Sequence, residues 1–265
     1  MEGMNVNLSS SELAKTVATP DREKRVHRSF DEEGYVIVRK AFPVNVLSGL
    51  ARALSLRLPE TGGHSVKSDI MAAEAPDHAL VYKGAQSIGT SAFAYRLLGQ
   101  KKFLDTLLAV TGLEEAQLHF MPLYLIIQLP GDQRFDYGWH QDRAYYSWCQ
   151  KMVTLWFPVN RKTTGATGTI SVIPGSHRQP TRGSKVHFRH GFFRQIESEV
   201  ESTEAVQEQV LELETGDCCI MEGDLVHRSV SNMSETPRVA AVLRIVSLPA
   251  EAIYQRDRFF CLTKP

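Results

Sequence analysis

The stretch Gly138-Trp139-His140-Gln141-Asp142 is the part of this sequence on which the interpretation of the whole chain depends. Apolar, β-branched runs flank it at residues 123–129 and 153–159, and they favour an extended strand over a helix. Because side chains alternate along a strand with a period of two, we expect His140 and Asp142 to project from the same face. An imidazole and a carboxylate side by side can hold one face of a metal ion.

A second histidine from a distant strand would complete the ligand set, and the best candidate is His227. It lies in Gly223-Asp-Leu-Val-His-Arg-Ser-Val-Ser231, which predicts a turn that leads into a strand. Two histidines and one carboxylate leave the other coordination positions open, an arrangement typical of non-haem Fe(II) oxygenases. Arg238, eleven residues past His227, opens an apolar strand. If these two residues lie on neighbouring antiparallel strands, the planar guanidinium sits beside the metal and can grip a carboxylate.

The remaining histidines and the cysteines are interpreted as structural, since a single histidine in a globular protein is more often structural than a ligand. These histidines are His27, His64, His78, His119, His177, His187 and His190. His187 and His190 form a His-x-x-His pair, but a Gly- and Arg-rich loop lacks the rigid support that a metal site needs. The cysteines show no Cys-x-x-Cys spacing, so buried thiols are favoured over zinc ligands or a redox pair. They are Cys149, Cys218, Cys219 and Cys261.

Composition argues against several classes of partner. Lys plus Arg and Asp plus Glu number 30 each, so the formal net charge is zero, and no general basic field for nucleic acid or an anionic membrane is indicated. No apolar run approaches the roughly 18 residues of a membrane-spanning helix. Residues 1–20 are polar and lack the apolar centre of a secretory signal, so we expect a flexible tail and a cytoplasmic protein.

The pattern along the 265 residues predicts one domain in which helices precede strands. Apolar residues have helical spacing at 21–30, 46–58, 92–98 and 103–110, and residues 59–79 read as a loop on the rim of a site. Short β-rich runs follow at 118–129, 153–159, 168–173, 209–213, 217–221, 225–231 and 238–247. We therefore expect a helix-rich buttress at 21–115 and a β-core at 116–248, arranged as a β-sandwich or jelly roll.

One charge asymmetry lies between the two parts of the expected site. Residues 175–196 carry five basic side chains and no acid, and seven glutamates follow at 197–214. The simpler interpretation is two solvated segments that partly neutralise each other. The alternative is a basic lid at 178–194 over an anionic substrate or a phosphate-bearing carrier.

Six pieces of the sequence, spread over roughly residues 28–247, resemble the phytanoyl-CoA dioxygenase family of Fe(II)- and 2-oxoglutarate-dependent oxygenases. They are Phe30-Asp-Glu-Glu-Gly-Tyr-Val-Ile-Val38, Trp139-His-Gln-Asp142, Ile173-Pro-Gly-Ser-His177, Gly216-Asp217, His227-x-Ser229-x-x-Asn232 and Arg238. The resemblance implies a double-stranded β-helix core, a cupin-like jelly roll, with flanking helices. It implies iron on His140, Asp142 and His227.

The resemblance also implies how 2-oxoglutarate is bound. Arg238 and Ser229 would hold this cosubstrate, and three further side chains would line its pocket, namely Trp156, Gln128 and Tyr146. Halogenating relatives lack the acidic ligand, so the presence of Asp142 favours hydroxylation. The expected reaction consumes O2 and 2-oxoglutarate, hydroxylates an unactivated C–H bond of a small molecule, and releases succinate and CO2.

Two alternatives stay open at this point. A cupin-like enzyme can use the same metal set without a keto acid, and a non-catalytic binding or sensing module can retain the same scaffold. The substrate is not determined, because basic and aromatic segments permit an anionic or carrier-linked molecule and equally a polar natural product or sugar. Neither the oligomeric state nor a choice among hydroxylation, desaturation and cyclisation follows from the sequence.

Overall fold

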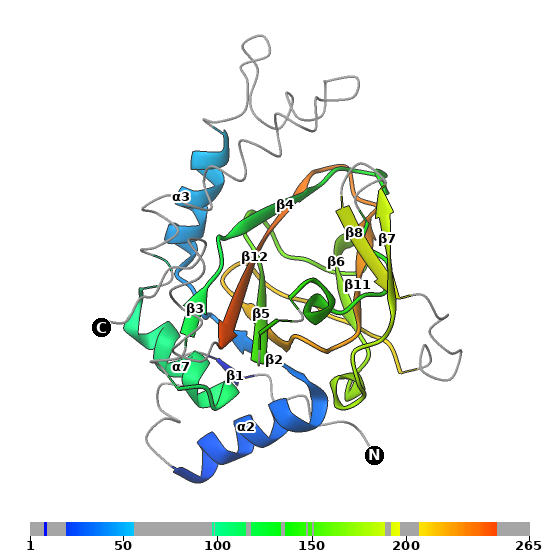
Figure 1. Ribbon diagram of the computed structural model, residues 1–265. Helices are drawn as coiled ribbons and strands as arrows, with labels where there is room; N and C mark the ends of the chain where they lie inside the picture. The colour runs from blue at the N-terminus through cyan, green and yellow to red at the C-terminus, as the bar shows by residue number, and fades with distance from the viewer. Residues whose placement is uncertain are drawn as a thin grey trace.

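The computed structural model describes residues 8–9, 20–55, 97, 99–114, 118–133, 136–146, 148–149, 151–188, 192–196 and 207–247. Within them the chain forms two layers of strands, with helices outside one layer (Figure 1). The expected loop at 59–79, most of the expected helix at 92–98, and His64, His78, His190 and Cys261 lie outside the described residues. The division of one domain into tail, buttress and core stays a prediction.

The described helices are α2 (Pro20–Glu33), α3 (Val44–Ser55) and α7 (Lys101–Thr111). They confirm the helical spacing at 21–30, 46–58 and 103–110 as far as the described residues reach. Helix α7 ends at Gly112, whose φ of 63° lies in the left-handed region that glycine adopts without strain. Its N–H donates to the carbonyl of Leu108 at 2.9 Å, which closes the last turn. No helix in the described part of the chain is long and apolar enough to cross a membrane.

The larger sheet carries most of the expected strands. Its order is β1 (Leu8–Ser9), β2 (Tyr35–Arg39), β10 (Cys218–Glu222), β5 (Lys151–Pro158), β12 (Arg238–Ser247) and β3 (Leu118–Phe120), with β4 (Tyr124–Gln128) also paired to β12. All of these pairs are antiparallel except the pair of β1 and β2. Strand β12 is next to last in this order, with β5 on one side and β3 and β4 on the other.

The second layer is built around β11 (His227–Asn232), which pairs with β6 (Thr167–Val172), and β6 pairs in turn with β9 (Gln209–Val210). The expected strand at 209–213 is thus shorter than predicted. A hairpin of β7 (Ser184–Phe188) and β8 (Phe192–Ile196) continues the layer, because the N–H of Ile196 donates to the carbonyl of Trp139 at 2.9 Å. The two facing layers form a double-stranded β-helix, or jelly roll.

Alternation along β5 and β12 separates two apolar clusters. Outward side chains such as Leu155 and Leu243 pack with Phe103 and Leu107 of α7, which covers that face of the sheet (Figure 1). Inward side chains pack between the two sheets. This inner cluster includes Tyr35, Ile37, Trp156, Ile170, Val172, Leu211, Leu213, Cys219, Met221, Leu225, Ala240 and Val242. Cys149, Cys218 and Cys219 are free and buried, as expected, and burial raises the pKa of Cys219 far above its usual value.

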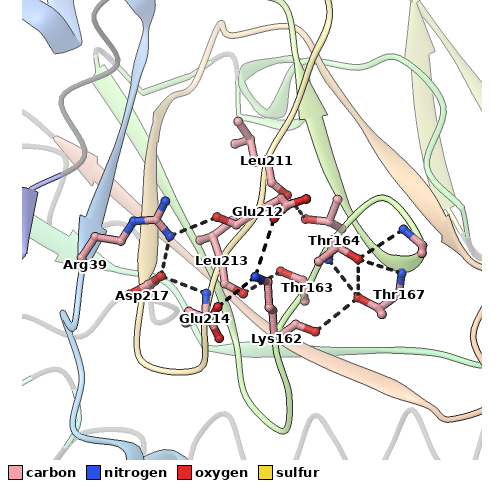
Figure 2. Close-up of polar contacts among 12 residues, drawn as sticks. Arg39, Lys162, Thr163, Thr164, Thr167, Leu211, Glu212, Leu213, Glu214 and Asp217 are labelled. Carbon is pink, nitrogen blue, oxygen red and sulfur yellow. Dashed lines mark hydrogen bonds and ion pairs between the residues drawn. The ribbon is translucent and has the colours of Figure 1, made fainter.

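A polar cluster around Asp217 holds the turn before β10 (Figure 2). The buried carboxylate accepts from the guanidinium of Arg39 at 2.7 Å and from the backbone N–H groups of Lys40 and Glu214, each at 2.9 Å. Lys162 reaches Glu214 at 3.0 Å and ties the neighbouring turn to the same place. Asp217 therefore has a structural role, because its carboxylate satisfies turn N–H groups that would otherwise lack partners.

The expected strand across His140 and Asp142 is wrong in its second half. His140 forms one isolated antiparallel bridge, to His227, and Asp142 opens a 3-10 helix, Asp142–Tyr145. The chain leaves the second layer here because the Asp142 carboxylate is bound on the larger sheet, by Thr154 and Arg244. The shared orientation of the two side chains is therefore produced by a turn and not by strand alternation.

The strands that carry His227 and Arg238, whose pairing the sequence leaves as one possibility, are not neighbours. His227 begins β11 in the second layer, and Arg238 begins β12 in the larger sheet. Residues 233–237 carry the chain from one layer to the other, so the two strands face each other across the core. The guanidinium consequently enters the interior from the sheet opposite His227.

Candidate active site

The structure brings His140, Asp142 and His227 together at one buried point. One potential ligand atom from each residue lies within 4.8 Å of the others, and all three residues are buried. The two histidines are direct backbone partners: the N–H of His140 donates to the carbonyl of His227 at 2.9 Å, and the reverse bond is 3.0 Å. Their ring centroids are 4.1 Å apart. This reciprocal bridge connects residues that are 87 positions apart in the sequence.

Both imidazoles are oriented by the main chain. Nδ1 of His140 lies 2.8 Å from the carbonyl of Gly138, and Nδ1 of His227 lies 2.9 Å from the carbonyl of Leu225. Because a carbonyl only accepts, each Nδ1 carries the proton, and each Nε2 presents a lone pair. Burial, with a further contribution from His227, lowers the pKa of His140 to about 3. The imidazole is therefore neutral near pH 7, as a metal ligand must be.

The third residue, Asp142, is held by side chains. Its Oδ1 accepts from the guanidinium of Arg244 at 2.8 Å, and its Oδ2 accepts from the hydroxyl of Thr154 at 2.6 Å. Burial by itself would raise the pKa of Asp142, but Arg244 outweighs that effect and holds the pKa well below the usual range. The carboxylate is ionised, and it supplies the negative charge that a divalent cation requires.

Arg244 and Thr154 were not identified from the sequence. One signal was present, because Arg244 interrupts the otherwise apolar run of β12, and a buried arginine requires an anion. The sequence did not indicate which acid that anion was.

Arg238 lies in a different electrostatic environment. The residue is 2% exposed, its guanidinium donates to Oε1 of Gln128 at 2.6 Å, and it lies 5.6 Å from the ring centroid of Trp156. Its Nε has no hydrogen-bond partner among the described residues. Burial lowers the pKa of Arg238 to about 10, and the charge of Asp136 opposes this only in part. A buried cation without a carboxylate partner is a site that an anionic ligand would stabilise.

A chain of hydrogen bonds orients Gln128 toward Arg238. The amide nitrogen of Gln128 contacts Oδ1 of Asp136, and Oδ2 of Asp136 accepts from the hydroxyl of Ser231 at 2.5 Å. Ser229 shares a strand with His227, two residues on, and its Oγ accepts from the N–H of Tyr137 at 3.1 Å. Since a hydroxyl can also donate, Ser229 retains a proton for a ligand between the sheets.

Of the five side chains expected to contact the cosubstrate, Arg238, Gln128 and Trp156 are brought together directly. Tyr146 lies elsewhere: its ring centroid is 5.8 Å from the guanidinium carbon of Arg244 and 6.0 Å from the ring of Trp148. Its assignment to the cosubstrate pocket stays a prediction.

The basic segment 178–194 is connected to the chain between His140 and Asp142. Gln141, which lies between these two residues, accepts from the N–H of Arg182 at 2.8 Å and donates to the carbonyl of Asp224 at 2.6 Å. A Cβ on Gly138 would lie 2.7 Å from the side-chain nitrogen of Gln195, so the end of the hairpin packs closely against this part of the chain. The start and end of this segment therefore form part of the wall beside the site.

The structural role expected of the other histidines is visible for two of them. His27 contacts the carbonyl of Val110 at 3.0 Å, and His177 contacts the carbonyl of Asp31 at 2.9 Å. These bonds attach α2 to α7 and to the loop after β6.

Comparisons with known proteins agree with this geometry. A family model described as Phytanoyl-CoA dioxygenase (PhyH) matches residues 30–240. The structure of EvdO2 from Micromonospora carbonacea var. aurantiaca complexed with 2-oxoglutarate is similar, with a TM-score of 0.56 and 20% identity over 85% of this chain and 91% of that chain.

Two further solved structures show the same fold. EctD from S. alaskensis, with 2-oxoglutarate and 5-hydroxyectoine, has a TM-score of 0.58 and 17% identity over 84% of this chain and 75% of that chain. The epimerase SnoN, in complex with Fe3+, alpha ketoglutarate and nogalamycin RO, has a TM-score of 0.61 and 14% identity over 93% of this chain and 97% of that chain. At these identities the likeness establishes the jelly-roll fold.

Proposed function

This chain belongs to the phytanoyl-CoA dioxygenase family, and from that premise we propose that it is a non-haem Fe(II)- and 2-oxoglutarate-dependent dioxygenase that hydroxylates an unactivated C–H bond of a small molecule. The observation that carries the proposal is the buried convergence of His140, Asp142 and His227 within 4.8 Å. Two imidazoles and one carboxylate are a ligand set suited to Fe(II) with open positions.

Each part of the site has a defined task in this proposal. Nε2 of His140, Nε2 of His227 and one oxygen of Asp142 hold the iron. Arg238, with Gln128 behind it, binds the carboxylate of 2-oxoglutarate that lies far from the metal. When bound, iron, 2-oxoglutarate and O2 supply the oxidising chemistry, with succinate and CO2 as co-products. We assign Ser229, Trp156 and Tyr146 to the surrounding pocket on the resemblance alone.

The protein also excludes water from the reacting atoms. All three proposed iron ligands are buried, and the ring of Tyr137 lies 5.4 Å from that of His140. Arg238 is buried in the same interior, where it contacts Trp156 and Gln128. A dry, charged interior strengthens the electrostatic grip on a small dianion and protects a reactive oxidant.

Two features favour hydroxylation with a keto acid over the alternatives. Asp142 completes the protein ligand set, whereas halogenating members of the family lack this carboxylate. The unpaired Arg238 has no evident use in a cupin-like enzyme that needs no keto acid. The substrate is proposed to be a small molecule.

The test is anaerobic binding followed by turnover. Fe(II) and then 2-oxoglutarate are added to the metal-free protein under anaerobic conditions, and the visible charge-transfer absorption of the chelate is recorded. We expect the band only when both are present. Release of succinate in air is then screened over anionic molecules, carrier-linked acids, sugars and polar natural products. Absence of both the band and metal binding would favour a non-catalytic module.

A further inference from the structure

The proposed metal ligands differ in how their orientation is maintained. The imidazoles of His140 and His227 are each fixed by a backbone carbonyl, whereas both oxygens of Asp142 are bound by side chains. Arg244 occupies Oδ1 and Thr154 occupies Oδ2. A backbone carbonyl is present whatever the residue type. The orientation of Asp142 is therefore the one that depends on the identity of other side chains.

These two donors form a single structural unit. Arg244 of β12 and Thr154 of β5 are direct cross-strand partners in an antiparallel pair. Side chains at such positions project from the same face of a sheet, with their Cβ atoms about 5 Å apart. That spacing allows two donors to reach the two oxygens of one carboxylate that arrives from the opposite layer.

Arg244 is committed to this contact. Its guanidinium carbon lies 5.8 Å from the ring centroids of both Tyr124 and Tyr146, so aromatic rings flank the charged group. Its side chain is 18% exposed, and that of Asp142 is 2% exposed. Within the described residues, Asp142 is the only carboxylate that forms an ion pair with Arg244. A charge in this setting is screened little by solvent, and it holds its partner in one geometry.

We propose that Arg244 and Thr154 form a two-donor clamp that positions Asp142 for metal binding, with Arg244 as the principal positioning residue. Each donor binds a different oxygen, which fixes the plane of the carboxylate and leaves further lone pairs on both oxygens for a metal ion. This inference rests on the proposed function, because it requires Asp142 to be a ligand.

The clamp is tested on the full-length, metal-free protein by titration with Mn(II), followed by electron paramagnetic resonance. We expect Arg244→Met to weaken Mn(II) binding by about 10–100-fold, the usual range for loss of a hydrogen-bond partner of a ligand. Thr154→Val is expected to weaken it by about tenfold, the lower end of that range. Arg244→Lys and Thr154→Ser, which retain a donor, are the matched controls and should recover most of the affinity.

A spectroscopic signature separates positioning from a merely structural role. With Co(II) in place of iron, the ligand-field absorption of Arg244→Met and Thr154→Val should change shape, because the carboxylate can rotate. Ser48→Ala, on the exposed face of α3 and outside the site, should leave the Co(II) spectrum and the Mn(II) affinity unchanged. If the Arg244→Met protein does not fold, the comparison of Thr154→Val with Thr154→Ser decides the matter alone.

The outcomes distinguish this inference from the proposed function. If the natural protein binds neither Mn(II) nor Co(II), the metal site and the clamp both fail. If it binds them and the Arg244→Met and Thr154→Val proteins show the same affinity and the same Co(II) spectrum, the clamp is refuted and the metal site stands. Loss of affinity with recovery in the lysine and serine variants supports the clamp.

Discussion

The two arginines of β12 lie six residues apart and face the same interior, yet their surroundings are opposite. Arg244 is paired with Asp142 at 2.8 Å, and this partner outweighs burial and raises its pKa above the usual value. Arg238 has amide, carbonyl and aromatic neighbours and forms no ion pair within the described residues, and burial lowers its pKa to about 10 against the opposing charge of Asp136. The charge of Arg244 is therefore compensated by Asp142, whereas no ion pair within the described residues compensates that of Arg238.

This difference between Arg244 and Arg238 indicates where an anionic ligand would bind. A buried charge is costly unless it is paired, so a compensated arginine contributes to the folded structure itself. An uncompensated arginine of the same kind is maintained at a cost in stability, and it gains its partner when an anion binds. This reasoning supports the proposal that the Asp142 end of β12 supports a metal ion and that the Arg238 end binds the cosubstrate.

The largest effect on turnover and stability is expected when Arg244 loses its partner and becomes unpaired like Arg238. Asp142→Ala removes a proposed iron ligand and leaves Arg244 as a buried cation without a partner. We expect substrate-dependent succinate formation to be abolished and the free energy of unfolding of the metal-free protein to fall by about 3–5 kcal/mol. Succinate release measures turnover, and urea unfolding measures the free energy of unfolding. Full turnover by this variant would refute the ligand assignment. His140→Ala should abolish turnover as well.

The opposite end should respond in binding and not in stability. Arg238→Met removes an uncompensated charge but also the hydrogen bond to Oε1 of Gln128. These effects oppose each other, so the free energy of unfolding of the metal-free protein should change little. The concentration of 2-oxoglutarate needed for half-maximal succinate formation should rise on the order of 100-fold, as for loss of one partner of a buried ion pair. Arg238→Lys keeps the charge but not the planar fork, so its requirement for 2-oxoglutarate should lie between those of the natural protein and Arg238→Met. An unchanged requirement for 2-oxoglutarate would remove Arg238 from this role.

Acid should distinguish the two ends in the metal-free protein. The pKa of His140 is lowered from 6.5 to about 3, so the unfolded state binds more protons than the folded state between these values. Stability is therefore present above about pH 6.5 and is lost as the pH falls toward 3, by up to about 1.4 kcal/mol per pH unit. Urea unfolding across this range should show a shallower slope for His140→Gln. The slope of Arg238→Met should match that of the natural protein.

The smallest expected effect concerns the support behind Arg238. Ser231→Ala removes the 2.5 Å hydrogen bond to Asp136, which in turn orients Gln128. Loss of one hydrogen bond of about 1 kcal/mol should raise the requirement for 2-oxoglutarate about fivefold. Ser48→Ala, on the exposed face of α3, is the control and should have no effect. Equal kinetics for the two variants would show that this chain of bonds does not act on Arg238.

Much of the fold could be predicted because it is encoded locally. Apolar alternation located the strands around Leu155 and Leu243, and helical spacing located α7 near Phe103. The path between His140 and Asp142 could not be predicted in this way. A turn that ends in a buried ion pair has no periodic signal, and the partner, Arg244, lies 102 residues away.

The sequence by itself determined the composition of the site: two imidazoles, a carboxylate, an arginine eleven residues past the second histidine, and strands to carry them. Only the tertiary structure decided that His140 pairs with His227 through the backbone, that Arg238 approaches from the opposite sheet, and that Arg244 rather than Arg238 neutralises Asp142. The physical reason is that side-chain periodicity is set within a few residues of chain. The pairing of buried charges is set by strand register and by which layers face each other, and these form only when the whole core is assembled.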